Sequence, residues 1–438
     1  PFQKRANSTM APHELRRPFK RPALSDQQKR REISLLRQSQ NRFDAQHRAR
    51  CLVSSVLSLQ SQTPEANDIE PEDASSDIEL DSVSQSKTEK ISGDIDVRQA
   101  SKLKGAEARR WFARQLMLPE WMIDVPDNLA DDWYVFARPA GKRCFVVSSC
   151  GTTVSRLRNG SICHRFPSAL PNGASNRDHS GAGQSYCILD CIFHEVDQTY
   201  YVIDMACWRG YSLYDCTAEF RFFWLTSKLT ETGACDPPSP YHKYRFSLVP
   251  IYCCDQSGLQ TAYMGGVTYS KDGLLFYNKH AHYQTGNTPL ALVWKDERCS
   301  QYVIDTDSKG QVPCQQQVVL ELQSDGKLFT SDDPPVVFGC LDGDFIQKSG
   351  FCSGLLLRFA LRDEGLSFVD GKVDKADLQY LGKSNRARAF ADSYSKVVFQ
   401  HTVRHSPLRI NDLIASIGSS GGKEHDAEAT DDIEMADW

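Results

Sequence analysis

The feature that most constrains the fold is a long series of short expected β-strands that follow one another in runs, with few helices between them. Apolar runs rich in β-branched and aromatic residues, separated by turn residues, continue from residue 133 to about residue 369. The first four expected strands are Trp133–Ala137, Cys144–Ser148, Tyr186–Glu195 and Thr199–Met205. The short link Val196-Asp197-Gln198 is typical of a hairpin. Because strands occur in runs and do not alternate with helices, the sequence predicts an antiparallel α+β fold.

Two helices are also expected, where apolar residues recur at helical spacing: Ala106–Leu118 before the first of these strands, and Asp215–Lys228 between two of them. The later expected strands are Lys243–Pro250, Gly273–Asn278, Pro289–Lys295, Val318–Leu322, Val336–Cys340, Leu355–Leu361 and Leu366–Val369. The strands after Gln315 could form a small second β-unit or extend the first sheet, and the sequence leaves both open.

The N-terminal segment differs sharply from the rest in charge. Residues 1–50 hold 13 Lys and Arg against four acidic residues, although the whole chain carries a net charge of −5. A helix is expected to begin at Ser25, which can cap it, and to run to about Arg50. Its apolar side is thin, so we expect it to be solvated or wrapped by a partner and not docked on its own domain.

The 15 cysteines are scattered, and no C-x-x-C pair recurs with zinc spacing. Cys187 and Cys191 lie in an apolar run and are expected to be buried, reduced thiols. No signal peptide or long apolar span is visible, so we expect a reducing compartment, either cytoplasm or nucleus.

One short motif has the outline of a catalytic site with its reactive groups replaced. Arg138-Pro139-Ala140-Gly141-Lys142-Arg143 resembles the K-x-D-G-x-R signature of nucleotidyl transferases, with Arg138 in place of the lysine nucleophile and Ala140 in place of the aspartate. A guanidinium stays protonated and cannot act as that nucleophile. Further fragments follow in the same order: Leu189–Ile192, Tyr201–Asp204, Asp272–Phe276 and Val293–Lys295. The resemblance implies a guanine-nucleotide scaffold that is not an enzyme. An unconventional capping guanylyltransferase that uses another lysine, such as Lys142, remains the alternative.

Longer blocks resemble the snurportins, the import adaptors of trimethylguanosine-capped small nuclear ribonucleoproteins. These blocks are Gln115–Pro126, Gly141–Arg143, Tyr186–Ile192, Gln198–Asp204, Cys207–Gly210, Phe220–Trp224 and Asp272–Tyr277. The resemblance covers roughly residues 13–50 and 103–300. It implies a capped small nuclear RNA and importin-β as partners, an exportin for recycling, and shuttling between nucleus and cytoplasm. It implies no cofactor, metal, membrane or small-molecule substrate.

The resemblance also implies roles for individual residues. Trp294 stands at the position that stacks on the cap guanine, where an ordinary core tryptophan is the alternative. Leu118 and Trp121 would face the dimethylated amine, although they could instead form a hydrophobic staple. Arg143 and Arg158 match phosphate-binding positions. Arg138 and Pro119 depart from the family beside the expected pocket, and Arg138 could add a phosphate contact.

The basic segment resembles an importin-β-binding helix, and a general RNA-binding arm is the alternative. Its candidate contacts are Arg16, Arg17, Lys20, Arg21, Lys29, Arg30, Arg31, Arg37, Arg42, Arg48 and Arg50. The expected organisation is a basic segment at 1–53, an acidic and polar linker at 54–101, a cap-binding domain at 102–310, a β-rich extension at 311–412 and a disordered acidic tail at 413–438.

Overall fold

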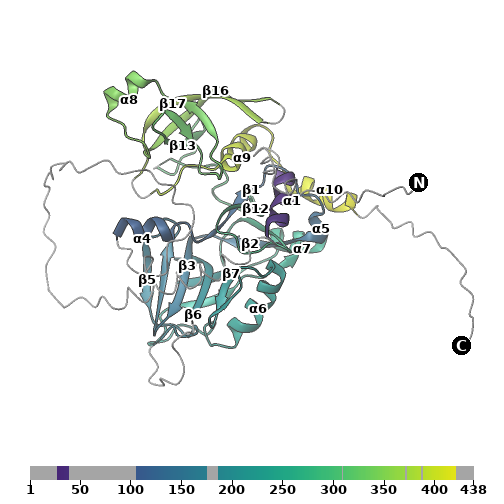
Figure 1. Ribbon diagram of the computed structural model, residues 1–438. Helices are drawn as coiled ribbons and strands as arrows, with labels where there is room; N and C mark the ends of the chain where they lie inside the picture. The colour runs from purple at the N-terminus through teal and green to yellow at the C-terminus, as the bar shows by residue number, and fades with distance from the viewer. Residues whose placement is uncertain are drawn as a thin grey trace, which may run out of the picture.

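The computed structural model describes residues 27–38, 105–174, 186–307, 309–369, 372–385 and 388–420. Within these ranges, a five-stranded and a seven-stranded sheet form the lower part of the molecule, and a second five-stranded sheet forms an upper unit (Figure 1). Strand pairs are antiparallel apart from β1 with β12 and β7 with β9, which are parallel. The prediction of a mixed α+β fold built on antiparallel sheets is confirmed.

The first sheet lies at the centre of the molecule. Its order is β1 (Met117–Trp121), β12 (Gly286–Trp294), β11 (Lys271–Asn278), β2 (Trp133–Pro139) and β10 (Tyr252–Cys253). The second sheet has the order β5 (Ile162–Phe166), β4 (Thr152–Leu157), β3 (Lys142–Ser149), β6 (Tyr186–His194), β7 (Thr199–Trp208) and β8 (Tyr211–Ser212), with β9 (Arg245–Leu248) paired to β7.

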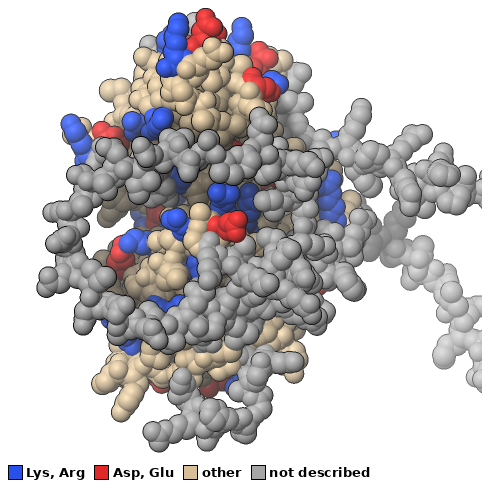
Figure 2. Space-filling view, turned by 60° about the vertical axis from the view of Figure 1, so that its left-hand side comes forward, with Lys and Arg blue, Asp and Glu red and all other residues tan. Residues whose placement is uncertain are grey.

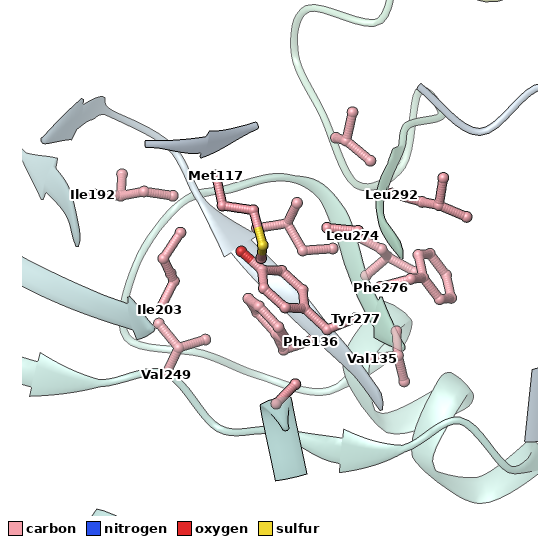
Figure 3. Close-up of a cluster of buried hydrophobic side chains, with 14 of the residues drawn as sticks. Met117, Val135, Phe136, Ile192, Ile203, Val249, Leu274, Phe276, Tyr277 and Leu292 are labelled. Atoms are coloured by element: carbon pink, nitrogen blue, oxygen red, sulfur yellow. The ribbon is translucent and has the colours of Figure 1, made fainter. Parts of the chain in front are cut away.

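The main core lies between these two sheets. Figure 3 shows Phe136 and Leu274 of the first sheet in one cluster with Ile192 and Ile203 of the second. The opposite face of the second sheet is also covered, so every residue of β6 and β7 is buried. Burial on both faces explains why these strands read as continuous apolar runs. Cys187 and Cys191 are fully buried free thiols, as predicted.

Four helices flank the two sheets: α4 (Gly105–Phe112), α5 (Leu129–Asp132), α6 (Ala218–Thr230) and α7 (Gln256–Met264). α6 confirms the second expected helix, and its N-cap residue Thr217 accepts a hydrogen bond from the backbone N–H of Phe220 at 3.3 Å. The first expected helix was too long, because the chain leaves it after Phe112 and enters β1 at Met117. Pro119 suits that edge strand and would break a helix. None of the helices in the described ranges is long and apolar enough to cross a membrane.

The upper unit is a separate small barrel, which settles the alternative left open for the strands after Gln315. Its order is β15 (Val337–Cys340), β14 (Lys327–Phe329), β13 (Gln317–Leu322), β16 (Leu356–Val369) and β17 (Lys372–Lys383), with α8 (Gly343–Ser349) between β15 and β16. β15 also approaches β17, since a Cβ on Gly339 would lie 2.9 Å from Leu378 Cδ1. This connectivity is that of an OB-fold, a partly open five-stranded Greek-key barrel.

After the barrel, the chain returns to the lower body. α9 (Tyr394–His405) and α10 (Ile410–Ser420) follow β17, and Leu413 of α10 is buried in the main core. The expected disordered tail therefore begins too early, because residues 413–420 continue α10. Residues of α9 and α10 therefore pack in the main core of the lower body.

The basic helix also docks on the body, which corrects the expectation that it could not. α1 (Gln27–Gln38) lies against the end of β1, where Arg30 pairs with Glu120 and Arg31 pairs with Asp124 at 2.8 Å. At the other end of α1, Gln38 Nε2 donates to the carbonyl of His280 at 3.2 Å. The small apolar area of this helix did not predict its docking, because ion pairs and amide hydrogen bonds hold it on the body.

Candidate functional site

A cleft of about 620 Å³ opens between the β1 edge of the first sheet and the residues that return from the barrel. Its volume is in the range of ligand-binding sites. Its lining comprises Leu118, Pro119, Trp121, Arg138, Lys142, Arg143, Leu157, Arg158, Asn159, Asn287, Val293, Lys295, Tyr302, Asp305, Arg388, Ala389, Phe390, Ala391, Asp392, Ser393 and Lys396. Seven of these residues are Lys or Arg and two are Asp, so the cleft is basic. In Figure 2, Lys and Arg side chains gather at the waist between the upper and lower parts, with a few carboxylates among them.

One end of the cleft is apolar and carries an indole. β1 supplies Leu118, Pro119 and Trp121, and each is partly exposed. The backbone N–H of Trp121 donates to Ser395 Oγ at 3.1 Å, and its ring centroid lies 4.8 Å from that of Phe399 on α9. These contacts fix the orientation of the Trp121 ring at the cleft wall.

Trp294 does not line the cleft, and its predicted stacking role is wrong. Successive side chains of a strand point to opposite faces, so Val293 and Lys295 enter the cleft while Trp294 faces the core. The Trp294 side chain is fully buried, and its Nε1 donates to the carbonyl of Leu408 at 3.0 Å. Trp121 is the tryptophan of the described cleft lining.

Arg143 enters the cleft wall but is largely committed to the fold. Its Nε and Nη2 donate to the two carboxylate oxygens of Asp190 at 3.0 and 2.8 Å, and Nη2 also donates to the carbonyl of Met117 at 2.7 Å. Burial acts to lower the pKa of Arg143, but the Asp190 carboxylate outweighs it and raises the pKa. Arg143 thus joins β3, β6 and β1 beneath the cleft.

The turn between β2 and β3 fixes the register of Arg138 and Arg143. Gly141 has φ of 140°, and a Cβ there would lie 2.3 Å from the carbonyl oxygen of Phe193. Only glycine therefore fits this position without a shift of the backbone. This close approach accounts for the glycine of the motif.

Arg138 occupies the position of the missing nucleophile and forms a cluster with two other charges. Its guanidinium is paired with Asp272, and Lys295 Nζ lies 2.5 Å from the other oxygen of the same carboxylate. Two cations share one carboxylate, so the cluster keeps a net positive charge. Lys295 Nζ also lies 5.7 Å from the centroid of the Trp121 ring, which shows that this face of the indole accepts a cation.

Arg158 is the exception among the cleft arginines. It is exposed in the turn between β4 and β5, and within the described ranges it makes no hydrogen bond or ion pair. Desolvation inside the cleft, together with the positive charges of Arg143 and Arg388, lowers the pKa of Arg158 to about 10. An anion bound here would relieve that repulsion.

No sequence pattern predicted the residues of the opposite wall of the cleft. Arg388 and Lys396 both contact Asp392 Oδ1, at 2.5 and 2.9 Å, and Lys396 also pairs with Asp305 at 2.5 Å. Arg388, Asp392 and Lys396 follow the barrel, far along the chain from β12 and beyond the blocks that resemble a known family. Only the return of the chain from the barrel brings them to Arg158.

Of the candidate contacts on the basic helix, Arg30 and Arg31 are paired with carboxylates of the body, whereas Lys29 and Arg37 are exposed. The remaining candidates lie outside the described residues: Arg16, Arg17, Lys20, Arg21, Arg42, Arg48 and Arg50.

Comparison with known proteins gives a class for the central segment. Residues 115–295 match the family model described as Snurportin1, m3G cap-binding domain. This segment holds the first sheet, the second sheet and one wall of the cleft. Over this segment the chain is snurportin-like.

Solved structures similar to the chain are DNA ligases. The mycobacterial DNA ligase D complexed with ATP and MES is 11% identical with a TM-score of 0.30, covering 64% of this chain and 97% of the ligase chain. The bacteriophage T7 ATP-dependent DNA ligase in complex with ATP is 10% identical with a TM-score of 0.29, covering 61% and 98%. Scores this low carry no conclusion about fold or function.

Proposed function

We propose that this chain binds the 2,2,7-trimethylguanosine cap of small nuclear RNA in the cleft and links the capped ribonucleoprotein to importin-β. The observation that carries the proposal is a cleft in a snurportin-like segment, with a partly exposed indole at its apolar end and, at its basic end, an arginine that makes no ion pair with any described residue. In this proposal the N7-methylated, positively charged base stacks on Trp121, and the cap phosphates lie toward Arg158. Stacking of a base on an aromatic side chain contributes about 1–3 kcal/mol.

The cleft also has features that would favour the trimethylated base over the monomethylated one. Leu118, Pro119 and Val293 offer apolar contacts to a dimethylated amine. A monomethylated cap would bring two N–H donors that need an acceptor. The carboxylates in the described lining, Asp305 and Asp392, are already paired with Lys396. An ordinary guanine amine would therefore lose its water without gaining a free carboxylate.

The adaptor part of the proposal rests on the basic N-terminal segment. Importin-β would take up the positive charges of α1 and of the basic residues around it. Because Arg30 and Arg31 are held by Glu120 and Asp124, α1 has to leave the body before an acidic partner can reach these side chains. Shuttling between nucleus and cytoplasm, with recycling by an exportin, completes the proposed cycle.

We further propose that the cleft does not form a covalent nucleotide adduct. Arg138 replaces the nucleophile and is held by Asp272. The hydrogen bond from Lys142 to Glu195 raises the pKa of the Lys142 amine, which keeps it protonated. Incubation with labelled GTP and Mg²⁺ tests this directly: a labelled protein–GMP band that Lys142→Arg or Lys295→Arg removes would establish the guanylyltransferase alternative.

Fluorescence titration of the full chain with trimethyl- and monomethyl-cap dinucleotides tests cap binding. We expect tighter binding of the trimethyl cap, and a loss of about 10- to 100-fold in Trp121→Ala, which matches the stacking contribution. Trp111→Ala is the matched control, because Trp111 lies on α4 and does not line the cleft. Equal affinity for the two caps would refute the selectivity.

Deletion of residues 1–50 separates the cap-binding proposal from the basic-arm alternative. Cap affinity should survive the deletion, whereas binding to purified importin-β should be lost. Loss of cap affinity in the deleted chain would instead favour a general RNA-binding arm.

A further inference from the structure

Residues 388–396 lead the chain back from the barrel to the lower body, and we call them the return segment. Their charged side chains line the same cleft as Arg158. The return segment contributes the charged residues Arg388, Asp392 and Lys396 to the lining, together with uncharged residues. It lies outside residues 115–295, so the match to the cap-binding family says nothing about it.

We propose that Arg158 and Arg388 form a polyphosphate site that joins the central domain to the barrel. In a capped RNA this site would hold the 5′–5′ phosphate bridge, so the inference extends the proposed function to a second half of the ligand. A nucleoside triphosphate also carries a chain of phosphates, and the probes in the experiment below distinguish it from the cap.

Arg158 and Arg388 line the same cleft, and the carboxylate that acts on both, Asp392, is already shared by Arg388 and Lys396. The positive charge of Arg388 is one of the causes that lower the pKa of Arg158, so the two guanidinium groups are close enough to repel. Arg158 makes no ion pair in the described ranges, and it is exposed to the cleft. A bound anion would turn this repulsion into two attractive contacts.

The return segment is hydrogen-bonded to the protein on one side and lines the cleft on the other. Arg388 Nε donates to the carbonyl of Phe390 at 2.9 Å and Nη2 donates to Asp392 at 2.5 Å, while Nη1 has no partner among the described residues. The buried Asp392 accepts from the backbone N–H of Val319 on β13 at 2.8 Å. Arg388 is thus oriented by the barrel and keeps one edge of its guanidinium for a ligand.

Trp121, on which the base would stack, also contacts this part of the chain. Its backbone N–H donates to Ser395 Oγ of the return segment, and its ring contacts Phe399 on α9. A ligand that stacks on Trp121 and extends toward Arg158 therefore follows the return segment. The return segment, which follows the last strand of the barrel, then forms one wall of the binding site.

The experiment compares the full chain with Arg388→Ala, Arg158→Ala and the control Arg358→Ala. Arg358 is exposed on β16 of the same barrel and does not line the cleft. The probes are trimethylguanosine nucleoside, the trimethyl-cap dinucleotide with its triphosphate bridge, GTP, and inorganic tripolyphosphate. We expect Arg388→Ala and Arg158→Ala each to weaken the cap dinucleotide and tripolyphosphate about tenfold, to leave the nucleoside within about twofold, and to reduce the salt dependence.

Each outcome decides the inference. Unchanged dinucleotide and tripolyphosphate affinity in Arg388→Ala overturns it, and so does an equal loss for the nucleoside, because the residue would then only support the fold. If the wild-type chain binds tripolyphosphate and GTP through Arg388 but no cap, the polyphosphate site stands and the proposed cap function fails. If it binds the nucleoside as tightly as the dinucleotide, cap recognition stands and the polyphosphate site fails.

Discussion

β1 separates two arginine-rich regions that differ in how their charges are compensated. On one side, Arg30 and Arg31 of α1 are paired with Glu120 and Asp124, and the buried Asp332 of the barrel adds a further negative charge near Arg30. On the other side, Arg158 faces the cleft without a partner in the described ranges. A count of basic residues makes the N-terminal segment the obvious binding site, yet two of its three described arginines, Arg30 and Arg31, pair with carboxylates of their own domain. The cleft is distinguished by an arginine without a carboxylate partner among the described residues, and not by the number of its basic residues.

The largest expected effect tests whether Trp294 belongs to the hydrophobic core or to the cleft. Trp294→Ala should lower the free energy of unfolding by about 3–5 kcal/mol, because it empties a fully buried position. Denaturant unfolding measures the change. The affinity for a cap dinucleotide, corrected for the folded fraction, should stay near that of the wild type. A selective loss of affinity in a stable Trp294→Ala variant would return the stacking role to this residue.

The next effect tests whether α1 is held by its arginines. Arg30→Ala removes the main partner of the buried Glu120 carboxylate, and we expect the opening free energy of α1 to fall by about 1–3 kcal/mol. Hydrogen exchange over residues 27–38 reports the opening. Arg37→Ala is the control, because Arg37 is exposed on the same helix. Equal exchange in both variants would mean that the ion pairs do not hold α1.

A smaller effect concerns pH on the acidic side of β1. Burial raises the pKa of Asp332 to about 6, assisted by the charge of Glu120, although hydrogen bonds from Thr330 and from the Tyr394 N–H oppose it. The folded state therefore holds this proton to a higher pH than the unfolded chain, and its stabilising effect is lost as pH rises from about 4 to 6. Asp332→Asn keeps an acceptor for the Tyr394 N–H. It should raise stability at pH 7 by about 2 kcal/mol and flatten this part of the profile. A variant less stable than the wild type at pH 7 would contradict this assignment.

The smallest expected effect lies on the cleft side. Arg158→Ala removes no ion pair and no hydrogen bond of the described structure, so the free energy of unfolding should change by less than about 0.5 kcal/mol. Thermal unfolding checks this. A large destabilisation would mean that Arg158 supports the fold, and the contrast between the two sides of β1 would disappear.

The strand pattern of the lower body was predictable because its signals are local. The hairpin at Val196-Asp197-Gln198 joins β6 to β7, and α6 begins near the expected helix. The first helix was too long because helical spacing continues beyond Phe112, and only pairing of β1 with β12 decides where the helix stops. Trp294 was misassigned for a related reason: Leu292, Val293 and Trp294 are all apolar, so no alternation shows which side chain faces the cleft.

The sequence by itself determined the positions of many strands along the chain, the altered catalytic motif and the uneven distribution of charge, since each of these depends on neighbouring residues. Only the tertiary structure decided which tryptophan lines the cleft, which arginines are already paired and which late residues complete the wall. The physical reason is that a side chain's exposure and its charge partners come from distant segments. Glu120 meets α1 and Arg388 faces Arg158 only after the chain has folded back on itself.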